Sequence, residues 1–266
     1  MGAAADRWAE QLASWAIPEE ILARAPSDPW RLSPSMFGAG SPVEEAPPDT
    51  PSRRLALEAL GDGGSVVDVG VGAGGASLHL APPAALIVGV DEDRDMLAAF
   101  AARAVERGVA TKTFPGRWPD IARAVPVADV VVSHHVLYNV ADLRPFAVAL
   151  TSHARRRVVV EIGARHPVSN TNPLWKHVWG IDRPEGPTAD DALAVLAEAG
   201  IDASSERDVR PSWTADITPE RIAFLTRRLC LPQERAPEVE EALALYPPAT
   251  ERETVTIWWD GGAPPF

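Results

Sequence analysis

The hydrophobic and polar positions of the chain form two kinds of segment that alternate. Short apolar runs rich in β-branched residues, typical of buried strands, fall at residues 66–69, 86–90, 128–132, 157–162 and 253–259. Two further strands are predicted at residues 109–114 and at about residues 201–209. Apolar residues recur at helical spacing over residues 55–60, 93–107, 188–200, 218–231 and 234–245. This alternation predicts a doubly wound α/β fold whose sheet is mostly parallel and has right-handed crossovers.

The first 50 residues precede this alternating core and predict a helical extension. Trp8 and Trp15 lie at helical spacing there, and a proline-dense acidic stretch over residues 42–51 predicts a linker. We therefore expect a helical N-terminal extension over residues 1–50 and an α/β domain over residues 51–266, with a helical insertion at about residues 211–250. The insertion either completes a binding pocket or forms the face of a homodimer.

Composition narrows the class of protein. The 266 residues are 46% hydrophobic with a mean hydropathy of -0.07, which suits one soluble domain with a cap or insertion. The net charge of -12 disfavours a nucleic-acid partner, because an acidic surface repels a polyanion. No apolar run approaches the roughly 18 residues of a membrane span, and residues 1–6 lack the features of a signal peptide. With one cysteine, Cys230, the chain is expected to be cytoplasmic.

The most informative stretch is the glycine-rich segment over residues 66–75. A β-branched run carries Asp68 near its end and leads into Gly70, Gly72, Gly74 and Gly75. Glycines permit backbone angles that a Cβ forbids, and they let the backbone approach a nucleotide-like ligand. The triplet Gly70, Gly72 and Gly75 also fits a dinucleotide site, but a carboxylate at the mouth of the strand would repel a pyrophosphate. Asp68 instead favours a ligand with a cationic head.

The pattern D-x-G-x-G-x-G at Asp68 to Gly74 resembles motif I of the class I methyltransferases, which bind S-adenosylmethionine. The resemblance covers about residues 55–163. It implies a Rossmann-like seven-stranded sheet whose last strand is antiparallel, and it implies that Asp68, Gly70, Gly72 and Gly74 receive the methionine end of the cofactor. Small-molecule methyltransferases often use N-terminal helices as a lid over the substrate, which is one role for residues 1–50; packing of Trp8 and Trp15 on the core is the alternative.

A second acidic position follows the next predicted strand. Asp91 and Glu92 end the run over residues 86–90, and Asp91 lies 21 residues after Gly70, near the spacing at which a carboxylate meets ribose hydroxyls. Both the nicotinamide and the methyltransferase interpretations predict this residue. We assign Asp91 and Glu92 to the cofactor site.

The loop after the third predicted strand departs from the family. Methyltransferases usually offer an acidic residue to adenine here, often directly after a glycine, whereas this chain has Arg117 after Gly116. Trp118 either stacks on the adenine or forms a plain hydrophobic lid, and Asp120 is the alternative polar contact. We include Trp118 in the predicted cofactor site.

The strand over residues 128–132 runs into a polar cluster at the edge where open α/β sheets bind ligands. It resembles the fourth-strand motif of small-molecule methyltransferases. We place Ser133 in the cofactor site and predict His134, His135 and Tyr138 as acid/base candidates facing the acceptor. The alternative is that one histidine turns inward. A second possibility is that no strong base is needed and that alignment of the nucleophile with the methyl group and the sulfur supplies most of the rate.

A long loop after the fifth predicted strand carries His166, Trp175, His177 and Trp179 and predicts a substrate wall. His166 and His177 have no known metal-ligand spacing, so no metal is predicted.

We thus predict a methyltransferase that uses S-adenosylmethionine to methylate an oxygen, nitrogen or carbon of a small molecule, with oxygen preferred. The alternatives are a nicotinamide-dependent oxidoreductase and a non-catalytic domain that binds S-adenosylmethionine and regulates.

Overall fold

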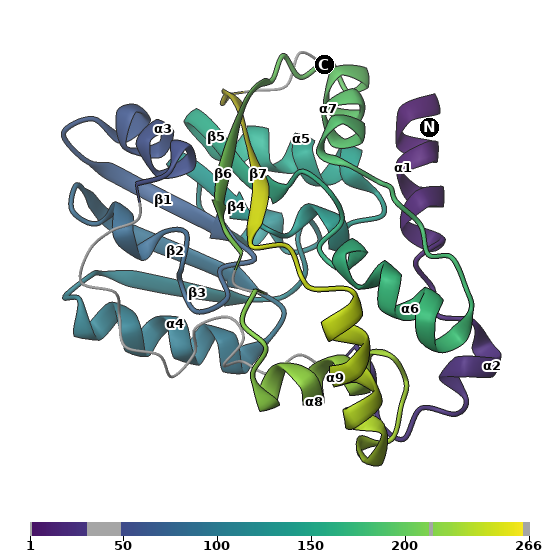
Figure 1. The fold of residues 1–266 in the computed structure, drawn as a ribbon. Helices are drawn as coiled ribbons and strands as arrows, with labels where there is room; N and C mark the ends of the chain where they lie inside the picture. The colour runs from purple at the N-terminus through teal and green to yellow at the C-terminus, as the bar shows by residue number, and fades with distance from the viewer. Residues whose placement is uncertain (1, 31–48, 213–214, 263–266) are drawn as a thin grey trace.

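The computed structural model describes residues 2–30, 49–212 and 215–262. Within these residues the chain forms one seven-stranded sheet in the order β3-β2-β1-β4-β5-β7-β6 (Figure 1). The strands are β1 (Gly64–Val69), β2 (Ala84–Asp91), β3 (Thr111–Pro115), β4 (Ala128–His134), β5 (Ala154–Gly163), β6 (Ser204–Pro211) and β7 (Glu251–Asp260). Strand β7 runs antiparallel to both neighbours, β5 and β6, while the pairs among β1 to β5 are parallel. The predicted fold class is confirmed.

Helices cover both faces of the sheet. Their bounds are α1 (Ala3–Ala13), α2 (Glu19–Leu22), α3 (Pro51–Leu60), α4 (Arg94–Glu106), α5 (Leu143–His153), α6 (Asn172–Trp179), α7 (Ala189–Glu198), α8 (Pro219–Arg228) and α9 (Ala236–Leu245). Buried side chains of α3 and α4 pack with those of the strands on one face. Helices α1, α5 and α7 supply the core on the other face. The sheet is therefore buried between two helical layers, as its continuous apolar strands predict.

A third cluster of buried side chains lies among α2, α6, α8 and α9, at the bottom and lower right of Figure 1. It contains Trp175 and Cys230, which are 3% and 1% exposed. Helices α8 and α9 lie between β6 and β7 in sequence, where the insertion is predicted. Whether this region is a dimer face stays a prediction.

Helix α6 differs from the expectation of a long loop after β5. Pro173 lies in its first turn, and Gly180 caps its end in the left-handed region at φ 67°. A proline at the start and a glycine just past the end are typical helix boundaries. The buried faces of Leu174 and Trp175 then hold the helix against the cluster of α2, α8 and α9.

The extension at the N-terminus packs on the domain through its tryptophans. Trp8 on α1 is fully buried, and its indole Nε1 donates to the backbone oxygen of Val140 at 2.7 Å. Trp15 donates to Gly186 O at 2.6 Å.

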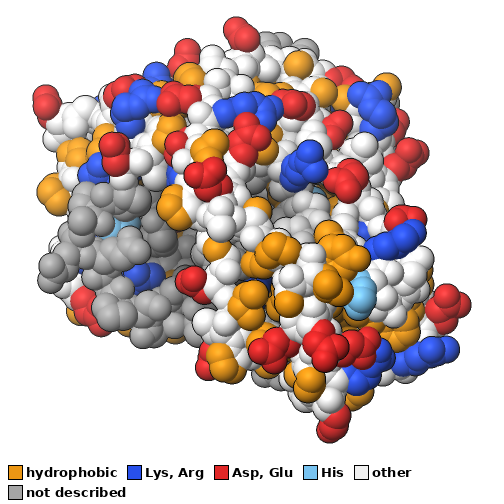
Figure 2. Space-filling model, in the orientation of Figure 1, with side chains coloured by type: hydrophobic (Ala, Val, Ile, Leu, Met, Phe, Trp, Pro, Cys, Tyr) orange, Lys and Arg blue, Asp and Glu red, His pale blue; other side chains and the backbone are white. Residues whose placement is uncertain are grey.

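Most of the linker predicted over residues 42–51 lies outside the described residues. No described helix is long and apolar enough to cross a membrane. Acidic and basic side chains are interspersed over the face in Figure 2.

Candidate active site

The glycine loop after β1 lies at the carboxyl end of the central strands. Gly70, Gly72 and Gly74 have φ of 74°, 52° and 85°, where a side chain is strained. A Cβ on Gly70 would lie 2.3 Å from Val136 Cγ2, and one on Gly74 would lie 2.6 Å from Leu78 Cδ1, whereas one on Gly72 meets nothing within 4 Å. Gly70 and Gly74 are therefore required by packing, while Gly72 presents bare backbone on an open side where a ligand can approach.

Asp68 is a fully buried carboxylate without a hydrogen-bond partner at either oxygen. Burial raises the pKa of Asp68 to about 7; the neighbouring Ser77 hydroxyl lowers it and the charge of Asp91 adds to the rise. A buried carboxylate of this kind is costly unless a cation or donor meets it. The site therefore fits a ligand that brings an ammonium or sulfonium group, as S-adenosylmethionine does.

Asp91 is held by two backbone amides. Its Oδ2 accepts from Gly72 N at 2.9 Å and its Oδ1 accepts from Asp93 N at 2.9 Å. These bonds join the end of β2 to the glycine loop and fix the carboxylate beside it, with a lone pair remaining on each oxygen. The structure thus brings Asp91 to the predicted cofactor loop, whereas Glu92 is exposed.

The other two residues predicted to contact the cofactor are engaged within the protein. Ser133 is fully buried, and its hydroxyl donates to Val69 O at 2.9 Å, which ties β4 to β1. Trp118 is 5% exposed and packs under α5, where its Nε1 donates to Phe146 O at 3.3 Å. Burial of an indole is favourable, so its ring lies in the core rather than at the surface of the loop. Asp120 is exposed.

Tyr138 is buried and joins two strand ends to the N-terminal helix. Its hydroxyl donates to Gly163 O at 2.8 Å, and its ring stacks on Trp8 with centroids 5.7 Å apart. Burial raises the pKa of Tyr138 above its usual value, with Asp191 and Asp190 adding to the rise. A phenol that keeps its proton and already donates it to a carbonyl is a poor proton acceptor.

The two histidines after β4 lie in different environments. His134 is half-buried, with an Nε2 that has no partner among the described residues. Burial lowers the pKa of His134 to about 4, against the opposing charge of Glu161. His135 adopts φ 60°, a conformation that costs energy for a residue with a Cβ. Its side chain is 47% exposed, and its Nε2 lies 3.4 Å from Glu161 Oε1.

Glu161 is the residue of this site that the sequence analysis did not single out. It is 3% exposed near the end of β5. It accepts from Ser52 Oγ at 2.6 Å and from Arg210 Nη1 and Nη2 at 3.1 and 3.0 Å. Burial alone would raise the pKa of Glu161, but His135, Arg210 and Ser52 hold it well below the usual range. Its sequence signal is a charged residue within the apolar run from Val158 to Ile162, because a carboxylate in a buried strand needs polar partners.

The residues of the predicted substrate wall do not converge. His166 is 9% exposed and stacks on Trp15 with centroids 4.2 Å apart, and burial lowers the pKa of His166 to about 4. His177 is exposed on α6 beside Tyr246. No group of three or more histidine, cysteine, aspartate or glutamate residues within the described ranges is arranged to hold a metal ion.

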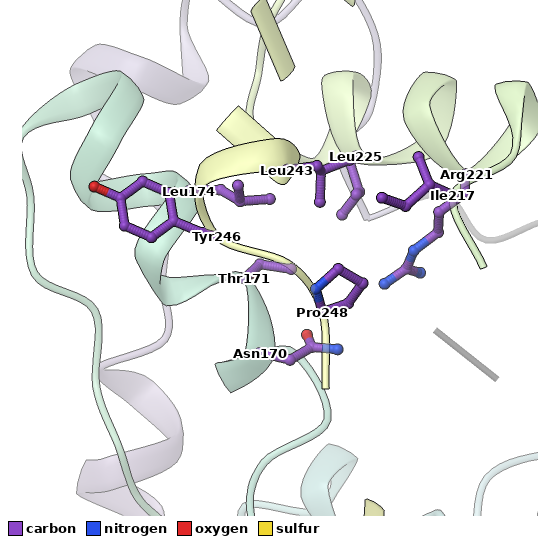
Figure 3. Close-up of a pocket in the computed structure, with 9 residues that line it drawn as sticks. All are labelled: Asn170, Thr171, Leu174, Ile217, Arg221, Leu225, Leu243, Tyr246 and Pro248. Carbon is purple, nitrogen blue, oxygen red and sulfur yellow. The ribbon is translucent and has the colours of Figure 1, made fainter. Parts of the chain in front are cut away.

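A small pocket lies within the helical cluster, between α6, α8 and α9 (Figure 3). Leu174, Leu225 and Leu243 form its apolar side, and Asn170 and Arg221 lie at its polar side. It shares no residue with the glycine loop or with the polar ends of β4 and β5. The site at the strand ends is therefore a separate feature.

Comparisons with known proteins agree with this geometry. Residues 67–156 match the family model of a methyltransferase domain. No curated protein matches the sequence. Among solved structures, the YcgJ protein of Bacillus subtilis is 16% identical with a TM-score of 0.53, and the alignment covers 79% of this chain and 97% of that one.

Two further solved structures have the same fold. A candidate methyltransferase from Bacillus halodurans is 14% identical with a TM-score of 0.53, over 79% of this chain and 96% of that one. A candidate sarcosine dimethylglycine methyltransferase from Galdieria sulphuraria is 14% identical with a TM-score of 0.53, over 80% and 83%. The family model shows that residues 67–156 match a methyltransferase domain, and the solved structures show that the chain has the Rossmann-like fold of the class I methyltransferases.

Proposed function

We propose that the protein methylates a hydroxyl oxygen of a small-molecule acceptor and that His135, oriented by Glu161, accepts the hydroxyl proton. The observation that carries this proposal is the 3.4 Å contact between His135 Nε2 and the buried Glu161 Oε1 at the carboxyl edge of the sheet. Asp68, Gly72 and Asp91 are the residues proposed to hold the cofactor, in a loop whose shape Gly70 and Gly74 allow. S-adenosylmethionine supplies a methyl group already activated by the positive charge on its sulfur.

The role of His135 follows from its two ring nitrogens. With the Nε2 proton directed at Glu161, Nδ1 remains as the acceptor of a proton. As the acceptor oxygen gains its methyl group, its O–H bond breaks and the proton moves to Nδ1. The imidazolium then formed is stabilised by the carboxylate of Glu161, whose own charge is secured by Ser52 and Arg210. Glu161 is thus a positioning residue.

The other two candidates are less suited to this step. Burial keeps His134 neutral and raises the pKa of Tyr138, and the Tyr138 hydroxyl is committed to Gly163 O. His135 is the exposed member of the three. The contacts of Trp8 and Trp15 with Tyr138 and His166 support the proposal that the N-terminal helices cover the acceptor side of the site.

The test is a pair of substitutions followed by pH-rate profiles. His135→Asn suits the left-handed backbone, because asparagine tolerates positive φ, and it should lower kcat by about 10²- to 10⁴-fold without loss of folding. Glu161→Gln should lower kcat, since the imidazolium that forms at His135 loses its carboxylate. The readout is methyl transfer from labelled S-adenosylmethionine to a panel of small alcohols and phenols.

Glu58→Gln is the matched control, because it removes an exposed carboxylate of α3 that makes only surface ion pairs with Arg54 and Arg157. It should leave both kcat and the profile unchanged. A wild-type level of oxygen methylation in His135→Asn would refute the role of His135. Transfer confined to amine or carbon acceptors would refute the preference for oxygen.

A further inference from the structure

The polar residues near Glu161 continue along one face of the sheet. Glu161 of β5 pairs with Thr256 of β7, and paired residues of neighbouring strands project to the same face. Alternate residues of a strand also share a face, so Thr254 and Arg252 follow Thr256 on the side that α3 covers. Because Gly163, the last residue of β5, pairs with Thr254, Arg252 lies beyond the carboxyl end of β5.

Arg252 is a cation with no protein partner in the part of the chain that the structure describes. Its Nε is buried and makes no hydrogen bond, and no described carboxylate lies within 4 Å of its guanidinium nitrogens. Directly opposite, Arg210 is engaged by Glu161 at 3.0 Å and by Asp208 at 2.5 Å. Like charges placed directly opposite on paired strands repel each other. A bound anion beside Arg252 would offset this repulsion.

The surroundings of Arg252 agree with a ligand. Burial and the charge of Arg210 lower the pKa of Arg252, while Glu161 raises it. Thr254 and Thr256 are each 1% exposed, and neither hydroxyl has a hydrogen-bond partner. Buried polar groups in proteins are nearly always paired. Three donors without a hydrogen-bond partner therefore follow one another along β7, from Thr256 opposite Glu161, through Thr254, to Arg252 near the first residue of the strand.

We propose that Arg252 binds the carboxylate of the acceptor, so that the protein methylates a hydroxyl of a small organic acid. A guanidinium binds a carboxylate with two parallel hydrogen bonds. One unpaired guanidinium balances the single charge of a carboxylate and falls short of the near-double charge of a phosphate monoester. This inference rests on the proposed function, because it assigns the other end of the acceptor whose hydroxyl faces His135.

The test uses matched acids and amides as probes. Wild type, Arg252→Gln and Arg207→Gln are titrated calorimetrically with para-hydroxybenzoate, with longer hydroxyaryl and hydroxyalkyl acids, and with the carboxamide of each, in the presence of S-adenosylhomocysteine. Wild type should bind at least one acid about 10- to 100-fold more tightly than its amide, the range expected for a hydrogen bond to a charged group. Arg252→Gln should abolish that preference and leave amide binding unchanged.

Arg207→Gln is the matched control, since Arg207 lies on β6 on the opposite face and pairs with Asp190 and Glu253. It should keep the preference for the acid. Equal binding of acids and amides by wild type, a preference that survives Arg252→Gln, or no binding of any acid would each overturn the inference.

Methyl transfer to the same panel separates the two proposals. If amides and neutral alcohols are methylated as well as acids, the anion site fails and the proposed function stands. If an acid binds through Arg252 but no hydroxyl in the panel is methylated, the proposed function fails and the anion site stands.

Discussion

At the scale of single residues, two carboxylates of the cofactor loop behave differently because their partners differ. Asp91 accepts from two backbone amides, whereas Asp68 is fully buried and accepts from none. The protein without ligand therefore contains a carboxyl group whose pKa is raised to about 7. Charge at Asp68 is tolerated best when a cationic ligand is bound.

Asp68 makes stability depend on pH. Burial raises the folded-state pKa of Asp68 to about 7 from its ordinary value of 3.8. The unfolded chain therefore releases this proton first, and folding loses stability as pH rises from about 4 to 7. The loss is at most about 4 kcal/mol. Asp68→Asn keeps the shape and removes the titration, so the ligand-free variant should exceed wild type in thermal stability at pH 8 and lose that advantage at pH 5.

Thermal unfolding of both proteins at several pH values measures this difference. Saturating S-adenosylhomocysteine, whose ammonium group compensates the charge, should restore the wild type at pH 8 and help the variant less. A stability difference that does not change with pH would show that Asp68 is ionised in the ligand-free protein.

The sequence identified the residues whose chemistry follows from local spacing. Asp68 and Asp91 were found from the glycine pattern and the strand ends, and the structure brings both to one loop. Glu161 was not singled out, because its role depends on Ser52 and Arg210, which are distant in sequence. The burial of Trp118 and Tyr138 could not be predicted from the sequence either, because it depends on which distant residues cover each ring.

At the scale of elements, the glycine loop divides its residues between packing and binding. Gly70→Ala would place a methyl group 2.3 Å from Val136, which forces the segment after β4 to move. Gly72→Ala meets no atom within 4 Å and adds only the strain of a left-handed backbone, about 1–2 kcal/mol. Gly70→Ala should therefore lower the melting temperature more, while Gly72→Ala should weaken S-adenosylmethionine binding with a smaller stability loss.

Melting curves and calorimetric dissociation constants for the two variants check this assignment. Unimpaired cofactor binding in Gly72→Ala would mean that the open side of Gly72 is not the ligand side.

The elements themselves were predictable to different degrees. Strands β1, β2, β4, β5 and β7 follow from apolar runs with buried residues, and the order of the sheet follows from the fold class. Strands β3 and β6 are more polar and largely exposed, so their sequences carry a weaker signal. The sequence analysis predicts a loop in place of helix α6, because residues 169–173 (Ser-Asn-Thr-Asn-Pro) are of types that favour turns and loops. Its stability comes from packing Leu174 and Trp175 in the helical cluster, which is tertiary information.

At the scale of the whole molecule, Tyr138 connects the N-terminal extension to the sheet. Its ring stacks on Trp8 of α1 and its hydroxyl bonds to the end of β5. Tyr138→Phe keeps the stacking and loses one hydrogen bond, so it should cost about 1 kcal/mol of stability and change kcat little. Trp8→Ala should cost about 3–5 kcal/mol, because it empties a fully buried site.

Denaturant unfolding and steady-state kinetics of both variants test this structural role. A kcat that falls in Tyr138→Phe as steeply as in His135→Asn would restore Tyr138 as a participant in proton transfer.

The burial of Cys230 has a practical consequence for spectroscopy. It is the single cysteine of the 266 residues, it is 1% exposed, and burial raises the pKa of its thiol. Because the thiolate is the reactive form, the native chain offers no accessible thiol to maleimide dyes. A cysteine introduced on the surface of α1 can thus be labelled selectively in the wild-type background, and paired with a second fluorophore it would report the position of the N-terminal helices during turnover.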